Sequence, residues 1–173
     1  VKANFEVSPD NQAFMNDENG NLLSKDGTTF MCSNTKNQTV VIPSTVKKIS
    51  EYGVYLYNNN VQQIVMNEGL EELGQGAIYY NKTIKKLIFP STLKKVDSKA
   101  FWAHSATTFI FKSMDTEFED GCFTASDTII APKGSTAEAA ANKIGATFIE
   151  LTSDTDLSQP AIVEKTKYVQ KEY

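Results

Sequence analysis

Hydrophobic and polar positions along the middle of the chain follow a pattern that repeats about every 23 residues. Val46, Leu70 and Leu93 occupy the same place in three successive repeats, and further columns of apolar or small residues keep the same register. This interval is too short for a pair of helices and fits one short strand with a return arc. One coil of that size cannot bury its own apolar side, so the coils must stack to form a continuous core. The pattern therefore predicts a solenoid.

The strand of each coil is expected where β-branched and aromatic residues are concentrated. Stacking would set these strands side by side, about 4.8 Å apart, in a single parallel sheet of four to five coils. The predicted strands cover residues 39–42, 62–66, 85–89, 108–111 and 128–131.

The first 35 residues do not follow the repeat. They contain an apolar run at 5–7, which predicts a short strand, and two glycine turn signals in the stretches DENGNLL and SKDGTTFM. Asn-Gly and Asp-Gly pairs between apolar positions are typical of β-hairpins. We therefore expect residues 1–35 to be a hairpin segment that caps the first coil, and residues 36–151 to be the repeat domain.

The repeat domain is expected to end in a helix near 135–144. Ser135 and Glu138 have the spacing of a capping box, alanines fill the helix interior, and Gly145 marks its end. The residues that follow, 152–173, are polar and out of register. They are either a tail or linker to a neighbouring domain of the same chain, or an extension packed on the stack.

Two eight-residue phrases that recur in the repeats resemble a known protein family. IPSTVKKI at 42–49 and FPSTLKKV at 89–96, with KAFWAH at 99–104, are similar to leucine-rich repeats of the BspA type. PKGSTAEAAANKIGATFIEL at 132–151 is similar to that family's C-terminal cap. The resemblance implies a leucine-rich repeat solenoid, mainly β with short arcs, in a secreted or surface-anchored bacterial protein that adheres to host or matrix ligands. It implies no catalytic residues. The chain departs from the family pattern at Asn67, where proline is usual.

Composition and charge narrow the functional classes. The net charge is −4 and the chain has no arginine, so it lacks the basic surface and the bidentate side chains that nucleic-acid binding uses. No stretch approaches the roughly 20 apolar residues of a membrane helix, so no membrane insertion is expected of this segment. We expect an extracellular or cell-surface location, with the signal and the anchor outside this sequence, which starts at Val1.

Residue types that carry catalysis or bind metals are sparse. His104 is the single histidine, and no Asp or Glu accompanies it at the spacing of metal ligands. It shares a column with Asn58 and Asn81 at the bend of the coil, where a polar side chain can bond backbone groups. Cys32 and Cys122 are far apart in the chain and are expected to be free thiols, with Cys122 buried in a column of small residues. The sequence predicts no catalytic residue, no metal site and no cofactor.

Paired charges occupy one column of the repeats and alternate in sign. Lys47-Lys48 is followed by Glu71-Glu72 and then by Lys94-Lys95 in successive coils. Opposite charges on adjacent coils attract, although exposed pairs contribute little to stability. We interpret these pairs as support for the coil register and for solubility.

The candidate binding surface is the outer side of the predicted sheet. Side chains alternate across a strand, so if Ile42, Ile64 and Ile129 face the core, their neighbours face outward. The outer side then carries an apolar column flanked by polar groups, a pattern that can mark an interaction site. The alternative explanation is that β-branched residues simply suit a parallel ladder. The candidate stripe comprises Val41, Gln63, Val65, Lys86, Ile88, Phe109, Phe111 and Ile130.

A second group of large side chains gathers on the convex arc of the repeats. Aromatic rings at a rim suit sugar rings or protein partners, and packing between coils is the structural alternative. The group comprises Tyr52, Tyr55, Tyr57, Tyr79, Tyr80 and Trp102.

Two functions fit these observations. The leading one is a non-catalytic secreted or surface module that binds a protein or glycan ligand, host-derived ligands included, through the sheet face. The alternative is a structural spacer that displays other domains of a larger surface protein and binds no ligand itself. A hydrolase has little support, because no acid–base pair is recognisable at a fixed spacing.

Overall fold

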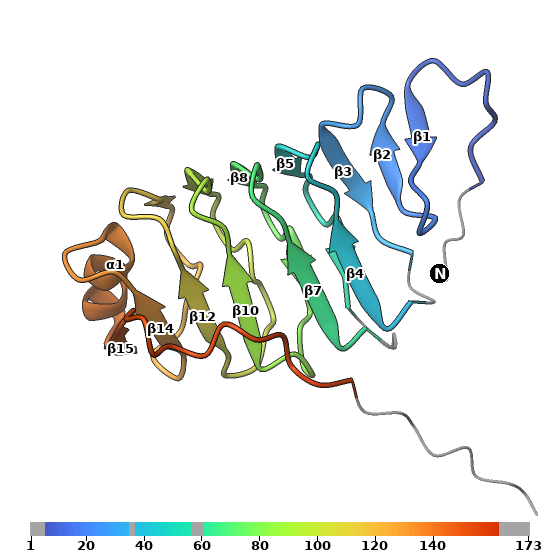
Figure 1. Cartoon of the computed structure of the whole chain (residues 1–173). Helices are drawn as coiled ribbons and strands as arrows, with labels where there is room; N and C mark the ends of the chain where they lie inside the picture. Colours follow the sequence, from blue (N-terminus) through green and yellow to red (C-terminus); the bar gives the residue numbers. More distant parts are fainter. Residues whose placement is uncertain (1–5, 35–36, 57–60, 163–173) are drawn as a thin grey trace, which may run out of the picture.

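Six strands, contributed by successive parts of the chain, line one face of the molecule, here called the main face (Figure 1). The computed structural model describes residues 6–34, 37–56 and 61–162. The strands predicted from the sequence are confirmed to within one residue, and a sixth follows the helix. They are β4 (Thr39–Ile42), β7 (Gln63–Met66), β10 (Lys86–Phe89), β12 (Thr108–Phe111), β14 (Thr128–Ala131) and β15 (Thr147–Glu150).

The main face contains two hydrogen-bonded ladders rather than the single sheet that was predicted. β4 pairs with β7 in one ladder, and β10, β12, β14 and β15 pair in that order in the other. All of these pairings are parallel. β7 and β10 are neighbours in space, but among the described residues no ladder joins them. The expectation of one continuous sheet is therefore wrong at this junction, and the stack is continued there by a ladder on another side.

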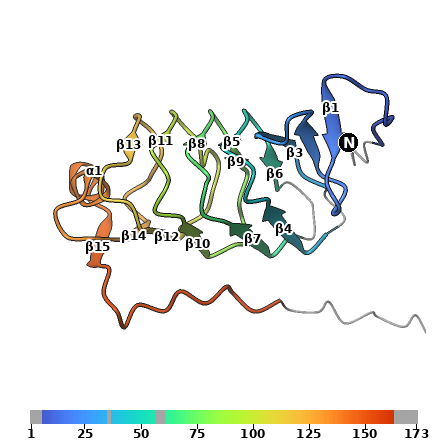
Figure 2. The same cartoon turned by 45° about the horizontal axis from the view of Figure 1, so that its top comes forward.

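The ladder on that other side, here called the side ladder, follows the side of the solenoid (Figure 2). It explains why the eight-residue phrase recurs. Each phrase starts at the end of a main-face strand, turns, and ends in a two-residue strand of this side ladder. One copy is therefore needed in every coil. The side-ladder strands are β5 (Lys48–Ile49), β8 (Glu72–Leu73), β11 (Lys95–Val96) and β13 (Glu117–Phe118).

The third side of each coil, here called the arc, is also hydrogen-bonded between coils. β6 (Val54–Tyr55) pairs in parallel with β9 (Ile78–Tyr79). The next coil continues this contact, because the Tyr80 backbone N–H donates to the Trp102 carbonyl (3.0 Å). Along the chain the arc follows the side ladder and precedes the return to the main face, as Figure 2 shows for β6 and β9.

Two hairpins cap the first coil, as the turn signals predicted. β1 (Phe14–Asn16) pairs antiparallel with β2 (Leu22–Ser24), and β2 pairs antiparallel with β3 (Thr29–Cys32). β3 then joins the side ladder by parallel pairing with β5. The short strand predicted at 5–7 is wrong for residues 6 and 7, which lie in no strand, and residue 5 lies outside the described residues.

The predicted helix is α1 (Thr136–Ile144). The Ser135 hydroxyl accepts a hydrogen bond from the backbone N–H of Glu138, and Gly145 ends the helix with a left-handed φ of 74°. Ala141 is fully buried, and its small side chain lets the helix pack closely against β14. The helix closes the end of the core.

The core of the later coils is built from stacked phenylalanines. The ring centroids of Phe89 and Phe111 lie 4.7 Å apart with planes 11° from parallel. Phe101 and Phe109 are also 4.7 Å apart. All four rings are fully buried, so together they contribute a large part of the apolar area that holds these coils together.

Candidate functional site

A column of aliphatic side chains, here called the outer column, follows the outer side of the main face. Strand register sets the members opposite one another within each ladder. Gln63 and Lys86 lie on the same side of their strands, two residues before column members, and both are half-buried. In chain order the outer column is Val41, Val65, Ile88, Ile110, Ile130 and Ile149.

Phe109 and Phe111, which the sequence placed on the outer side, point into the core instead. They are 0% and 1% exposed and pack with the other core phenylalanines. Ile110, between them, takes the outward position opposite Ile88. The candidate stripe is therefore wrong at these two residues, and it omitted Ile110.

The error comes from one residue missing from the turn before β12. Tyr80 and Ala103 share a left-handed backbone and hold the same place in successive coils, at the regular spacing of the repeat. Lys86, however, pairs with Thr108, which lies one residue short of that spacing. A shift of one residue moves every side chain of a strand to the opposite face. An alignment at the regular spacing of the repeat therefore assigns each side chain of β12 to the wrong face.

The chain's own residues 152–162 lie across the outer column (Figures 1 and 2). They run from β15 past β14, β12 and β10 on the outer side of the main face. Lys86 forms an ion pair with Asp156, with 3.0 Å between the charged atoms. The side-chain amide of Gln63 donates a hydrogen bond to the carbonyl of Pro160. Two of the predicted stripe residues thus bind the chain itself.

This segment buries the centre of the outer column and leaves its ends accessible. Ile88 and Ile110 are 6% and 1% exposed although they point away from the core cluster. Val41, Val65 and Ile130 are half-buried. The main face is therefore a surface whose middle is already occupied.

The arc presents a cluster of rings, three of them exposed and two half-buried, here called the aromatic cluster: Tyr52, Tyr55, Tyr79, Tyr80 and Trp102. Tyr79 lies at its centre, with its ring centroid 5.2 to 5.7 Å from those of the other four. Tyr52, Tyr55 and Trp102 are 45%, 38% and 51% exposed. Tyr57, predicted for the same group, lies outside the described residues. Packing between coils explains Tyr79, but it leaves the outer rings open to a partner.

A left-handed backbone position sets the direction of one of these rings. Tyr52 has a φ of 55°, and Gly76, which occupies the same place in the next coil, has a φ of 61°. A Cβ on Gly76 would lie 2.7 Å from Cε1 of Tyr52, so the tyrosine ring rests on the glycine backbone. The left-handed region costs a tyrosine about 1–2 kcal/mol and costs glycine almost nothing. The sequence did not indicate this shared left-handed backbone, because tyrosine and glycine have no chemical property in common that would align the two positions.

Two lysines border the aromatic cluster. The Lys99 Nζ lies 6.0 Å from the centroid of the Trp102 ring, and the Lys82 Nζ lies 5.3 Å from that of Tyr80. Ammonium groups at these distances are attracted by the negative face of an aromatic ring. The cluster therefore combines apolar ring surface with a cationic border.

His104 belongs to a buried hydrogen-bond network at the bend of its coil. Its Nδ1 lies 2.5 Å from the Phe101 carbonyl, and its Nε2 lies 2.8 Å from the Asp127 carboxylate, which also accepts from the backbone N–H groups of Thr107 and Thr124. Burial alone would raise the pKa of Asp127, but these hydrogen bonds, led by that of His104, hold it below its ordinary value. Both ring nitrogens are engaged, so the pair stabilises the turn and has no nitrogen left to activate a nucleophile.

The structural role predicted for this column is confirmed by its hydrogen bonds. Asn81 accepts from the backbone N–H of Ile84 and donates to the carbonyl of the same residue. Asn58 lies outside the described residues. Asp127 was not identified from the sequence. It lies one coil beyond His104, and only an alignment of the polar positions between coils would have pointed to it.

The alternating charges meet as predicted. Glu71 lies between Lys47 and Lys94, at 3.6 and 2.5 Å, and Lys48 lies 3.1 Å from Glu72. The contacts are on the surface of the side ladder, where they support the coil register at little gain in stability.

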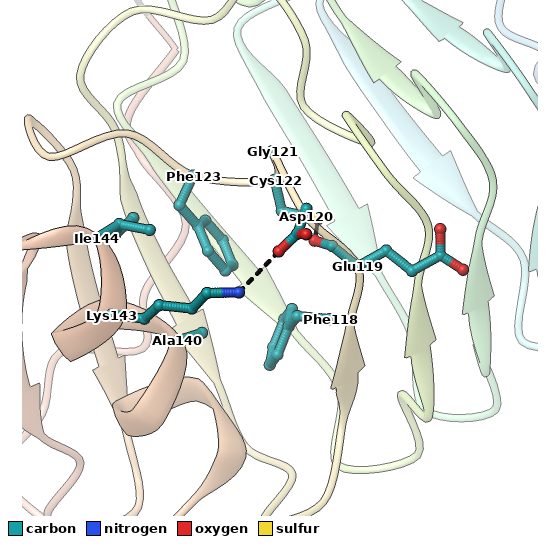
Figure 3. A pocket seen from close by; sticks show the side chains of 9 residues that line it. All are labelled: Phe118, Glu119, Asp120, Gly121, Cys122, Phe123, Ala140, Lys143 and Ile144. Atoms are coloured by element: carbon teal, nitrogen blue, oxygen red, sulfur yellow. Dashed lines mark hydrogen bonds and ion pairs between the residues drawn. The ribbon is translucent and has the colours of Figure 1, made fainter.

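A small cleft lies between α1 and the last coil (Figure 3). Its volume is about 60 Å³, well below the hundreds of cubic ångströms that a small-molecule site usually has. Lys143 and Asp120 form an ion pair across it (2.8 Å). Burial raises the pKa of the Cys122 thiol, which lines the cleft, to about 12, so the thiol stays protonated and is a poor nucleophile. A neighbouring depression of about 330 Å³, bordered by Phe118 and Ala140, is open to solvent.

Both cysteines are free thiols. Within residues 6–34, 37–56 and 61–162, no group of three His, Cys, Asp or Glu side chains is placed to hold a metal ion. No helix in the same part of the chain is long and apolar enough to cross a membrane.

A family model and a solved structure match the chain. The family model, described as "BspA type Leucine rich repeat region (6 copies)", matches residues 26–133. The crystal structure of the pneumococcal vaccine antigen PcpA is similar over 84% of this chain, with 17% sequence identity and a TM-score of 0.45, and the match covers 49% of that chain. A search of the curated proteins finds none that matches.

Proposed function

This chain belongs to the BspA-type leucine-rich repeat family, and we propose that it is a non-catalytic module of a secreted or cell-surface protein that binds a protein partner through the aromatic cluster. The single observation that carries the proposal is the exposure of three large rings around a packed fourth, with Tyr52, Tyr55 and Trp102 at 45%, 38% and 51%. Tyrosine and tryptophan dominate the energetic centres of protein interfaces.

The cluster is arranged before any partner arrives. Tyr79 contacts all the other rings of the cluster and holds them in place. Side chains that are already ordered lose little rotamer entropy on binding, so more of the contact energy becomes affinity. The rings also expose apolar area to water, and covering that area is favourable.

The border of the cluster indicates the chemistry of the partner. Lys82 and Lys99 lie beside Tyr80 and Trp102, although the chain as a whole has a net charge of −4. A partner with an apolar centre and acidic residues around it would match this surface. The rings are also suited to stacking on sugars. The test below must therefore distinguish a glycan partner from a protein partner.

The strain at Tyr52 also supports a functional role. The same column holds Gly76, which adopts a left-handed backbone without cost. A tyrosine at such a position persists only because the surrounding structure holds it, and residues of this kind gather at functional sites.

The main face, which the sequence suggested as the binding surface, supports the proposal less well because residues 152–162 cover its centre. That same contact favours a second candidate function, a structural spacer. In a spacer the outer column would be satisfied within the chain, as Ile88 and Ile110 are.

The test is binding of the purified chain to an array of extracellular-matrix proteins and glycans. Tyr52→Gly and Trp102→Ala remove rings from the cluster, and we expect each to weaken binding to a protein hit about tenfold or more. Phe14→Ala, which removes an exposed ring (38%) from β1 outside the cluster, is the matched control and should bind normally. Circular dichroism establishes that all variants are folded.

Each alternative has its own result. Hits among glycans alone would change the class of partner. A hit lost in Val65→Lys but kept in the ring variants would move the site to the main face. No hit on any surface would favour the spacer.

A further inference from the structure

The outer column is buried only where residues 152–162 pass over it. Ile88 and Ile110 are 6% and 1% exposed, whereas Ile149, on the last strand of the same column, is 47% exposed. Ile149 lies on the edge strand β15, but Ile130 on β14 has a strand on each side and is still only half-buried. Strand position alone therefore does not account for the burial of Ile88 and Ile110, which lie on β10 and β12, two strands that the segment crosses (Figure 1).

Two polar anchors hold the segment on neighbouring strands. Lys86 on β10 pairs with the Asp156 carboxylate, and the amide of Gln63 on β7 donates to the Pro160 carbonyl. Gln63 is itself oriented, because its side-chain oxygen accepts a hydrogen bond from the Thr39 hydroxyl (3.1 Å). The main face therefore offers a cation, an oriented amide and an apolar floor in a fixed arrangement.

The segment carries matching features. The backbone N–H of Ser158 donates to Asp156 Oδ1 (2.9 Å) and shapes the chain around the carboxylate. Hydrogen bonds from Ser158, followed by that from Lys86, hold the pKa of Asp156 well below its ordinary value, so the group is charged at neutral pH. The ligand for this surface is thus an extended backbone with one acidic side chain.

The segment is docked but contributes little buried surface of its own. Leu151 makes the last ladder contact, donating its N–H to the Ala131 carbonyl (2.8 Å). Beyond it, residues 152–162 form no helix or strand, and Leu157 is 43% exposed. Segments with few buried apolar contacts open at low cost, so this one can leave the face without unfolding the coils.

We propose that the main face is a binding site for an extended acidic peptide segment, and that residues 152–162 are its resident and displaceable ligand. Lys86 selects the carboxylate, Gln63 fixes the backbone, and Ile88 and Ile110 form the floor. The site lies on a different side of the coil from the aromatic cluster, so this proposal does not depend on the proposed function.

The first experiment follows the isoleucine methyl groups and the backbone amides of the whole chain by NMR. Lys86→Glu and Asp156→Lys should each shift the methyl resonances of Ile88 and Ile110 and move the amides of 152–162 toward random-coil values. The double variant Lys86→Glu/Asp156→Lys should restore the original spectrum, because it restores the ion pair in reverse. Lys143→Glu makes the same charge change on α1, where Lys143 pairs with Asp120, and should leave these resonances unchanged.

The second experiment adds a synthetic peptide of residues 151–162 to the whole chain. A tethered segment competes at an effective concentration on the order of millimolar. The peptide should therefore shift the Ile88 and Ile110 methyls of the Asp156→Lys chain at about tenfold lower concentration than those of the unmodified chain. A peptide carrying Asp156→Lys should not.

Two results would overturn the proposal. Random-coil amides for 152–162 in the unmodified chain would show that the segment is not docked. Docked amides together with no peptide-induced shift in the Asp156→Lys chain at millimolar peptide would show a fixed packing contact rather than a binding site.

Discussion

The main face and the arc both present large side chains on their outer sides, but the main face covers its central ones whereas the arc leaves them exposed. Ile88 and Ile110 on the main face are 6% and 1% exposed, whereas Tyr52 and Trp102 on the arc are 45% and 51% exposed. From hydrophobicity alone, the isoleucines of the main face would be the better candidate for a binding surface than the rings of the arc. The difference shows that a surface is available for binding only where no other segment of the chain packs on it.

The backbone explains why one surface is covered and the other is not. Main-face strands alternate their side chains regularly, which produces an even surface that an extended segment can cross. The arc contains left-handed residues at Tyr52, Tyr80, Lys99 and Ala103. These positions break the alternation and produce an uneven surface of tilted rings, which suits a partner with a matching shape.

The largest predicted effect separates the two faces of β12. Phe109→Ala removes a fully buried ring from the core and should lower the free energy of unfolding by about 3–5 kcal/mol. Ile110 lies under a segment that can shift to fill the space, so Ile110→Ala should cost less, about 2 kcal/mol, the low end for a buried isoleucine. Urea denaturation of the two variants measures both values. Equal costs would mean that the crossing segment packs as firmly as the core.

The second prediction concerns the turn that connects the arc to the main face. Asp127→Asn keeps the shape of the side chain but removes the charge that His104, Thr107 and Thr124 stabilise. We expect a loss of about 2–3 kcal/mol in the free energy of unfolding at pH 7, because buried partners of a charged group are left poorly satisfied. Thermal denaturation measures it, and Asp115→Asn on an exposed turn is the control.

The pH dependence of the same group follows from its lowered pKa. A carboxylate whose pKa is lower in the folded state than in the unfolded chain stabilises the fold above the ordinary value of 3.8. That contribution is lost as the pH falls from there through the lowered folded-state pKa. Other carboxylates, Glu68 among them, act in the same direction. Asp127→Asn should therefore reduce the acid sensitivity of the unfolding midpoint without abolishing it, and an unchanged slope would contradict the assignment.

The third prediction tests how the aromatic cluster is built. Gly76→Ala places a methyl group 2.7 Å from the Tyr52 ring at a left-handed position, and should cost about 1–3 kcal/mol. In a Tyr52→Gly background the contact is gone and only the backbone strain of about 1 kcal/mol should remain. A double-mutant cycle by denaturation gives the coupling between the two sites. Additive costs would mean that the ring does not rest on the glycine.

The sequence was sufficient for the features that repeat and insufficient for those that occur once. Strand positions, the side-ladder phrase and the helix bounded by Ser135 and Gly145 recur in every coil or follow local capping rules, so they could be predicted. The one-residue shortening before β12 lies in a turn, where no apolar column records it, and it exchanged Phe109 with Ile110.

For residues 152–173 the sequence left packing on the stack as one of two alternatives, but the path of the crossing segment and its contacts could not be predicted, for a different reason. Its anchors are a carboxylate at Asp156 and a backbone carbonyl at Pro160, and neither is marked by a hydrophobic period. The left-handed backbone of Tyr52 was equally invisible, because a tyrosine gives no local signal for that conformation.

The smallest predicted effect concerns the side ladder, which differs from both the main face and the arc in presenting mainly charges. Glu71→Gln removes the contacts to Lys47 and Lys94 together. Exposed ion pairs gain little over their solvated partners and are screened by salt. We therefore expect no measurable change in the thermal midpoint at physiological salt, and only a slight decrease at low salt. Glu72→Gln, which removes the contact to Lys48, is the matched control. A decrease comparable to that of Gly76→Ala would mean that the charged column fixes the coil register, and that the side ladder stabilises the fold as much as the arc does.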